Sequence, residues 1–463
     1  MFKTHAHRTL DMTQGPVFSQ VIFFALPIML SSILQLLFNA ADLVVVGRYC
    51  GSISGAAVGA TGSITNLIVN LFIGLSVGAG VTVAHALGSR EQTVVHNTVH
   101  TALPTALVSG VFLTVVGVSL SKTFLIWMET PANILPLSTL YMQIYFGGMV
   151  FNMVYNFCAA IMRSSGDSKR PMIYLTIAGV VKVLLTYAFV AFFNMRVEGV
   201  ALATIISWAL SAALALVSLF KEEGITKINP KKLRFYKDEV KEILFIGLPV
   251  GLQNGLWAIA NVVISAAVNS FGPDATTGVS IANNYDGILY QISTAPGIAV
   301  MPYVSQNIGA SNVKRAERSV WCGMLITTIL GGGFGALSAI FAGPLSSIMS
   351  DVPAVIAYSQ QKMVIISSTY FICGIYHIMG SALSGMRRPN IPTIATFLFM
   401  CVLRFVWVYC VFPFFPNLTF LYLVWPIGWI LSIAMELCFY FPTLKKLRHV
   451  HAHAEHGADK PAI

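Results

Sequence analysis

Ionisable side chains placed within apolar runs are the residues of this sequence that could do chemistry. Asp42 follows a long apolar stretch, with Asn39 three residues before it and Gln35 four residues before Asn39. This spacing puts the three side chains on one face of a helix. A charge at the centre of a bilayer costs roughly 2.5–3.5 kcal/mol on insertion scales, so such a face is expected to bind ions or water and not lipid. The structural alternative is a carboxylate that only stabilises helix packing.

Other charged residues need partners for the same reason. Lys182 lies within the run VVKVLLTYAFV, too deep in apolar sequence to reach water easily, so it needs an acceptor. Asp286 belongs to a second polar stripe that includes Asn283 and Tyr290 at helical spacing. Arg404 and Glu436 are expected to pair with each other.

Further polar and aromatic side chains in the apolar runs are expected to line a cavity. Any one of them alone is more simply an interhelical hydrogen bond, but together they exceed what packing requires. The expected cavity residues are Gln35, Asn66, Asn70, Tyr145, Asn152, Asn156, Gln253, Asn254, Trp257, Asn261, Asn283, Tyr290 and His377.

No spacing in the sequence suggests catalysis, a metal site or a cofactor. The seven cysteines are scattered singly, without the C-x-x-C spacing of zinc or redox sites. No span supplies paired acids or a nucleophile with a base at helical spacing. We therefore expect neither an enzyme nor a bound metal or cofactor.

The elements that position these residues must be membrane helices. Of 463 residues, 56% are hydrophobic and only 10% are charged, whereas soluble proteins carry about 25% charged residues. This composition excludes a soluble enzyme, a nucleic-acid-binding domain and a disordered chain. The fold class is all-α, a polytopic membrane protein whose main solvent is lipid.

Twelve apolar runs reach the length of about 20 residues that a membrane helix needs. They are expected near 17–46, 55–82, 95–120, 134–160, 171–193, 197–220, 241–268, 276–305, 317–343, 354–382, 391–412 and 418–441. Of the 28 basic residues, nearly all fall at the N-terminus, in alternate connections and in the C-terminal tail. The exceptions are Arg48, Lys122 and Arg196 on the opposite face, and Lys182, Lys362 and Arg404 inside spans or at their ends. This asymmetry predicts that both termini are cytoplasmic and that the protein lies in the plasma (inner) membrane.

The chain divides into two similar halves around a polar linker. We expect a six-helix lobe at 1–220, a cytoplasmic linker at 221–240, a second six-helix lobe at 241–443 and a cytoplasmic His-rich tail at 444–463, for which metal binding stays open. The halves match in three places: Ala25-Leu26-Pro27 with Gly247-Leu248-Pro249, Val83–Gly88 with Val304–Gly309, and Ser165–Pro171 with Ser384–Pro389 after a one-residue deletion. Because six is an even number, the two repeats run parallel and a pseudo-two-fold axis along the membrane normal relates them.

The span count, the repeat and several motifs together resemble the multidrug and toxic compound extrusion (MATE) family of bacterial secondary transporters. The motifs lie at 26–27, 42–47 (DLVVVG), 163–171 (RSSGDSKRP), 199–204 (GVALAT) and 306–310 (QNIGA). The resemblance implies an antiporter that exports amphipathic, often cationic compounds in exchange for protons or sodium. Its partners would be a small organic substrate, the coupling ion and membrane lipid, with no nucleic acid and no obligate protein partner.

The resemblance also assigns roles to residues. Asp42 would couple to the ion, with Thr204 and Asn39 nearby; the Asn and Asp that members carry on the fifth helix are replaced here by Lys182 and Thr186. A fixed ammonium beside Asp42 would take the place of a sodium ion, so proton coupling is favoured. The alternative places coupling in the other lobe, around Asp286.

Two other functions fit the architecture less well. A flippase for a lipid-linked substrate of the same superfamily would usually have fourteen spans and a strongly cationic cavity. A channel would need a filter motif or a ring of charges, and none is visible.

Overall fold

The computed structural model describes residues 11–455, and within that range the chain is helical without strands. The last part of the expected His-rich tail lies outside the described residues. The first half contains α1 (Val17–Tyr49), α2 (Gly51–Ser89), α3 (Gln92–Trp127), α4 (Leu135–Gly147), α5 (Met149–Ser164), α6 (Lys169–Ala191) and α7 (Val197–Lys221).

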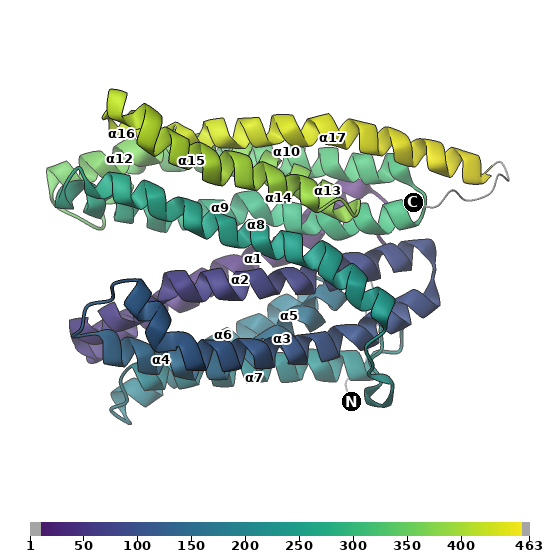
Figure 1. The fold of residues 1–463 in the computed structure, drawn as a ribbon, viewed down its shortest axis with the longest axis horizontal. Helices are drawn as coiled ribbons and strands as arrows, with labels where there is room; N and C mark the ends of the chain where they lie inside the picture. Colours follow the sequence, from purple (N-terminus) through teal and green to yellow (C-terminus); the bar gives the residue numbers. More distant parts are fainter. Residues whose placement is uncertain (1–10, 456–463) are drawn as a thin grey trace. The chain divides into compact units, whose positions relative to one another are not determined.

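The second half repeats this order after a short 3-10 turn, η1 (Pro230–Lys232). It contains α8 (Lys237–Asn269), α9 (Pro273–Gly309), α10 (Val313–Ile340), α11 (Ala342–Ser347), α12 (Pro353–Ser367), α13 (Tyr370–Gly385), α14 (Asn390–Thr396), α15 (Leu403–Val406), α16 (Leu418–Tyr422) and α17 (Val424–Glu455). Two π-helical turns, η2 (Phe397–Val402) and η3 (Trp407–Val411), continue α14 and α15, and a 3-10 turn, η4 (Phe412–Phe414), follows. Figure 1 colours these elements in chain order.

Nine helices among the described residues are long and apolar enough to cross a membrane, and eleven if each of two bent pairs counts as one span. The bent pairs are α4 with α5, at 46°, and α12 with α13, at 45°. They occupy the expected spans 134–160 and 354–382, one in each half. The one expected span that this count omits, 276–305, corresponds to α9. This helix has 37 residues but carries too many small and polar side chains to count as apolar.

The chain forms two compact units whose borders fall inside α1 and α8. The first unit contains Leu30–Gly251 and the second contains Thr13–Met29 together with the chain from Leu252 onward. Both borders lie two residues after a proline inside the helix, Pro27 in α1 and Pro249 in α8. The units follow spatial contacts, whereas the expected lobes follow the sequence repeat, so the two divisions differ at these helices.

Close packing explains why the beginning of α8 belongs to the first unit. Gly74 and Gly78 of α2 lie against Gly247 and Gly251 of α8, and a Cβ atom added at Gly74 would come within 2.3 Å of the Gly251 backbone nitrogen. Glycines four residues apart on both helices let the two backbones approach.

The positions of residues with positive φ angles also follow the repeat. Left-handed φ angles occur at Gly51 and Gly272, at Arg90 and Ser311, and at Gly166 and Arg387. The separation along the chain is the same for all three pairs, and the two members of a pair follow or precede the same helix of their halves. The loop after α5 therefore corresponds to the loop after α13 without a deletion, which corrects the pairing of Ser165–Pro171 with Ser384–Pro389.

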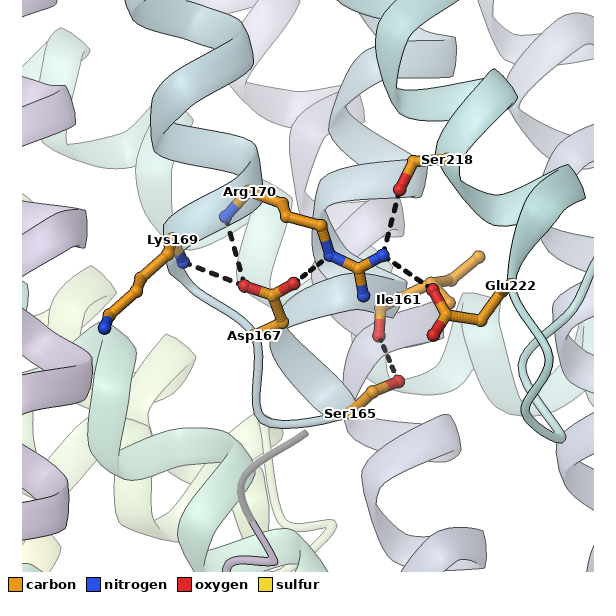
Figure 2. Close-up of polar contacts among 7 residues, drawn as sticks. All are labelled: Ile161, Ser165, Asp167, Lys169, Arg170, Ser218 and Glu222. Carbon is orange, nitrogen blue, oxygen red and sulfur yellow. Dashed lines mark hydrogen bonds and ion pairs between the residues drawn. The ribbon is translucent and has the colours of Figure 1, made fainter. Parts of the chain in front are cut away.

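The loop between α5 and α6 is held by a network of ion pairs in the first unit. Figure 2 shows Arg170 between Asp167 on one side and, on the other, Ser218 of α7 and Glu222, which directly follows α7. The Arg170 Nη1 atom donates to Glu222 at 2.7 Å, and the Asp167 Oδ1 atom accepts from the backbone N–H groups of Lys169 and Arg170 at 3.0 Å each. Asp167 thus satisfies two of the free donors at the start of α6. The network fixes the start of α6, the helix that carries Lys182, relative to α7.

Candidate functional site

The first unit brings four expected ion-coupling residues together between α1 and α6. The Lys182 Nζ atom lies 2.6 Å from Asp42 Oδ2 and donates to Asn39 Oδ1 at 3.0 Å. The Thr186 hydroxyl donates to the other carboxylate oxygen, Asp42 Oδ1, at 3.0 Å. Both oxygens of the carboxylate are thus occupied, one by an ammonium and one by a hydroxyl.

Helical spacing on both sides produces this cluster. Asn39 and Asp42 lie three residues apart on α1, and Lys182 and Thr186 lie four residues apart on α6, so each pair shares one helix face. Asp42 and Thr186 are buried. Breaking a buried ion pair by removing one partner typically costs about 3–5 kcal/mol, so the cluster ties α1 firmly to α6.

Thr204 does not join this cluster through a hydrogen bond. It is buried on α7 and its hydroxyl donates to the Val200 carbonyl of its own helix at 2.9 Å. Gln35 lies one turn before Asn39 and is exposed.

The remaining cavity residues of the first unit divide into exposed or half-buried amides and a packed aromatic group. Asn66 is exposed and Asn70 is half-buried on α2. The Asn156 side chain donates to the Asn152 side chain at 3.1 Å within α5. The Tyr145 ring packs edge-on against Trp208 of α7, with centroids 4.8 Å apart.

The second unit contains an ion pair of the same composition on helices that the repeat does not relate. The Lys362 Nζ atom of α12 lies 2.9 Å from Asp286 Oδ2 of α9 and also donates to the side chain of Asn283. As with Asn39 and Asp42, the amide and the carboxylate are three residues apart on one helix. Asp286 and Lys362 are both buried.

A second buried cation of this unit, Arg404, forms no ion pair with a carboxylate within residues 11–455. The Arg404 Nη1 atom donates to Asn261 Oδ1 of α8 at 2.7 Å. The guanidinium carbon lies 5.4 Å from the ring centre of Trp257 and 5.1 Å from that of Trp425. The expected pair between Arg404 and Glu436 is wrong: both Glu436 oxygens, which are fully buried, lack a hydrogen-bond partner among the described residues. Spacing along each helix cannot show whether two residues on different helices face each other, and here they do not.

The other expected cavity residues of the second unit extend this aromatic environment. The Trp257 ring lies 5.4 Å from Tyr290, and Tyr290 lies 5.4 Å from His377, measured between ring centres. The Gln253 side chain donates to the Tyr376 hydroxyl at 3.2 Å. Asn254 is exposed and has no place in this group.

Sequence reasoning missed several residues of these clusters. Lys362 was noted only as a charge within a span, although a lysine in an apolar run is the same signal that singled out Lys182. Trp208 and Trp425 carried no signal that distinguished them from core residues. Among the described residues, no group of three or more His, Cys, Asp or Glu side chains could hold a metal ion.

Comparison with known proteins identifies the family. The MatE family model matches twice, at residues 27–188 and 249–410. The chain belongs to the MatE family. The starts and the ends of the two matches are separated by one constant offset, which also relates Pro27 to Pro249 and Asn39 to Asn261. The twofold repeat, the all-helical fold and a transporter in place of an enzyme follow from this membership.

Curated relatives of the MatE chain carry related names. A probable multidrug resistance protein YpnP of Bacillus subtilis is 26% identical over 372 residues, covering 80% of this chain and 83% of its own. A probable multidrug resistance protein NorM of Thermotoga maritima is 25% identical and covers 82% of both chains. An FAD transporter of Shewanella oneidensis is 25% identical over a shorter stretch, 55% of this chain and 57% of its own.

Solved structures agree in fold. A multidrug resistance MATE family transporter of the MOP superfamily, in an outward-facing conformation, has a TM-score of 0.88 at 18% identity and covers 96% of this chain and 99% of its own. A superfamily transporter from Pyrococcus furiosus, described as having a binding pocket of reverse polarity, has a TM-score of 0.83 at 19% identity, with coverage of 96% and 98%.

Proposed function

We propose that this MatE transporter is a secondary antiporter that exports amphipathic organic compounds in exchange for protons. The observation that carries the proposal is the buried ion pair between Asp42 and Lys182, because it joins two helices through a group that a proton can neutralise. The names of the multidrug resistance relatives support the export of varied compounds. The family resemblance adds the expectation that these compounds are often cationic.

A proton would act on the pair in a simple way. Protonation of the Asp42 carboxylate removes its charge and so removes the attraction that holds Lys182 against α1. Lys182 then retains only Asn39, and the Thr186 hydroxyl remains beside a neutral carboxyl group. A contact between α1 and α6 that weakens with protonation is a two-state element, which is what coupling of an ion gradient to a conformational change requires.

Sodium fits the same place poorly. The Lys182 ammonium is already 2.6 Å from the carboxylate, and a sodium ion bound there would be a second positive charge close beside it. Two such charges within about 4 Å repel by about 4 kcal/mol at the effective dielectric constant near a protein surface. The pair therefore favours proton over sodium coupling.

The second ion pair keeps open the alternative that coupling occurs around Asp286. It has the same carboxylate, ammonium and amide, and one oxygen of Asp286, Oδ1, has no hydrogen-bond partner among the described residues. We prefer Asp42 because its second oxygen accepts a hydrogen bond from Thr186. A change of the Asp42 charge therefore alters two contacts with α6, one with Lys182 and one with Thr186.

The membrane orientation is part of the proposal. The excess of Lys and Arg in alternate connections favours an inner-membrane protein with both termini in the cytoplasm. The ion-paired loop between α5 and α6, with Asp167 and Arg170, would then lie on the cytoplasmic face.

Transport by the purified protein in liposomes tests the proposal. We expect export of a fluorescent organic cation when a proton gradient is imposed and no export when only a sodium gradient is imposed. Sodium-driven export that disappears in Lys182→Ala would contradict the assignment. Movement of a fluorescent lipid-linked oligosaccharide in place of the soluble compound would favour a flippase.

A further inference from the structure

The repeat relates the Asn39–Lys182 contact of the first unit to the Asn261–Arg404 contact of the second. Asn261 follows Asn39, and Arg404 follows Lys182, at the same offset that separates the two matches of the family model. In each unit the cation donates to the amide oxygen. The acid does not repeat, because Ile264 stands where the first unit has Asp42. Arg404 is therefore the counterpart of Lys182 without its carboxylate.

A π-helical turn explains the register of this correspondence. The helices α6 and α14 begin at Lys169 and Asn390. Arg404 therefore lies one residue farther from the start of its helix than Lys182 lies from the start of α6. The π-helical turn η2 precedes Arg404 and accommodates the extra residue. The insertion turns Arg404, and not Leu403, toward Asn261.

Two nitrogen atoms of the Arg404 guanidinium donate no hydrogen bond among the described residues. Arg404 is fully buried, and its Nε and Nη2 atoms have no hydrogen-bond partner among the described residues. The Nε1 atom of Trp257, whose ring lies against the guanidinium, is buried and without a partner in the same way. Three nitrogen donor atoms, two on the guanidinium and one on the neighbouring indole, thus lack an acceptor among the described residues.

Such an arrangement is costly unless an acceptor completes it. A buried charge without a partner is strongly destabilising, and cation–π contacts do not supply the acceptors that its N–H groups lack. A guanidinium presents its N–H groups in a fork that matches the two oxygens of a carboxylate. The guanidinium lies over one face of each of the Trp257 and Trp425 rings, and the rest of each indole is apolar surface against which an attached ring system can pack.

We propose that Arg404, Trp257 and Trp425 form a binding site in the second unit for the carboxylate of an aromatic organic acid. The oxyanion accepts from Arg404 Nε and Nη2, and the ring lies against the indoles. The proposal rests on the proposed export function and narrows its substrate class to amphipaths that carry an acidic group. A zwitterion, with a basic group as well, satisfies this site and the expectation of cationic substrates together.

Three probes with one ring test the charge that the site prefers. 1-Naphthylacetate, its methyl ester and 1-naphthylmethylammonium are titrated into the purified full-length protein in detergent, with binding measured by calorimetry. We expect the acid to bind roughly tenfold or more tightly than the ester, because a hydrogen bond to a charged group is worth about 1.5–3 kcal/mol. Equal affinities for acid and ester in the wild type would overturn the proposal.

Two variants locate the preference. Arg404→Gln is expected to bind acid and ester equally. Ile264→Asp places the carboxylate of the first unit beside an intact Arg404, so it should occupy the free N–H donors and also abolish the preference for the acid. Arg448→Gln is the matched control, because Arg448 pairs with Glu317 and is half exposed, and it should keep the preference. A preference that survives both Arg404→Gln and Ile264→Asp would refute the site.

The same titrations separate the site from lipid binding and from the transport proposal. Displacement of the acid by phosphatidylglycerol but not by phosphatidylcholine would assign the oxyanion to a lipid headgroup and overturn the substrate assignment. Binding in detergent needs no gradient, so a lost acid preference leaves the proton-driven export of the fluorescent cation in liposomes as an independent result. Failure of that export, with the acid preference intact, would contradict only the proposed function.

Discussion

In each unit a basic side chain contacts an asparagine, and the repeat relates the two asparagines. The units differ in the groups that surround the positive charge. In the first unit Lys182 contacts Asn39 and the Asp42 carboxylate. In the second unit Arg404 contacts Asn261 and the faces of two tryptophans. The first site is an internally neutral pair, and the second is a cation whose Nε and Nη2 atoms have no hydrogen-bond partner among the described residues.

This difference suggests that the two units of a duplicated fold have different roles. In the first unit an ammonium and a hydroxyl occupy both carboxylate oxygens, whereas the guanidinium of the second unit presents N–H groups in a geometry that matches a carboxylate. Under the two proposals above, the first site would couple to the proton and the second would recognise an anion. The separate pair of Asp286 and Lys362, on helices unrelated by the repeat, then stabilises the second unit from within.

The largest expected effect is the loss of coupling in Asp42→Asn. The amide cannot gain or lose a proton, so we expect proton-driven export to fall on the order of a hundredfold, the range typical for removal of a proton-transferring group. Export in liposomes under an imposed proton gradient measures it. Asp286→Asn is the comparison, because it also leaves a lysine without its carboxylate. At equal amounts of folded protein it should keep more transport than Asp42→Asn; the reverse result would move coupling to the second unit.

Next in size is the stability that the second unit draws from its own ion pair. Removing one partner, in Asp286→Asn or Lys362→Gln, should lower the free energy of unfolding by about 3–5 kcal/mol, because the other charge is left buried. The double variant should recover most of this loss, since it leaves no unpaired charge. Denaturant titration in mixed micelles, followed by tryptophan fluorescence, gives the comparison. Additive losses in the double variant would show that the two residues act independently.

Much of the first unit's site was predictable, and the reason is local. The stripe of Asn39 and Asp42, and the depth of Lys182 in an apolar run, are visible from spacing along one helix and from the cost of charges in lipid. The all-helical fold and the repeat followed in the same way, from composition and from matches at a constant offset, and the family model confirmed them.

The residues of the second unit's site were largely named from the sequence, but their pairings were not predictable, because they depend on relations between helices. Arg404 was expected to meet Glu436, and Lys362 had no assigned partner. Both assignments depend on which faces of α9, α12, α15 and α17 meet. The π-helical turn before Arg404 changes its direction by one residue, and nothing in the spacing of the sequence announces that insertion.

A smaller effect should separate the two kinds of cation. Arg404→Lys gives the second unit the ammonium of the first, which stacks less well on Trp257 and Trp425. We expect the free energy of unfolding to fall by about 1–2 kcal/mol, the value of a desolvated cation–π contact. Trp425→Leu, measured by the same denaturant titration, should produce a similar loss in the wild type and little further loss in Arg404→Lys. Fully additive losses would argue that the indole does not act through the charge.

The smallest expected effect concerns the loops that the repeat shares. Ser311 has a φ of +61° after α9, at the position where the first unit has Arg90 with a φ of +59°. An L-residue pays about 1–2 kcal/mol for this left-handed conformation, and glycine avoids that cost but loses about 0.5–1 kcal/mol in unfolded-state entropy. Ser311→Gly should therefore raise the free energy of unfolding by about 0.5 kcal/mol. Ser63→Gly is the control: Ser63 is exposed in the middle of α2, where glycine lowers helix stability by up to about 1 kcal/mol. If both variants lost stability equally, left-handed strain would not be the property that these loops share.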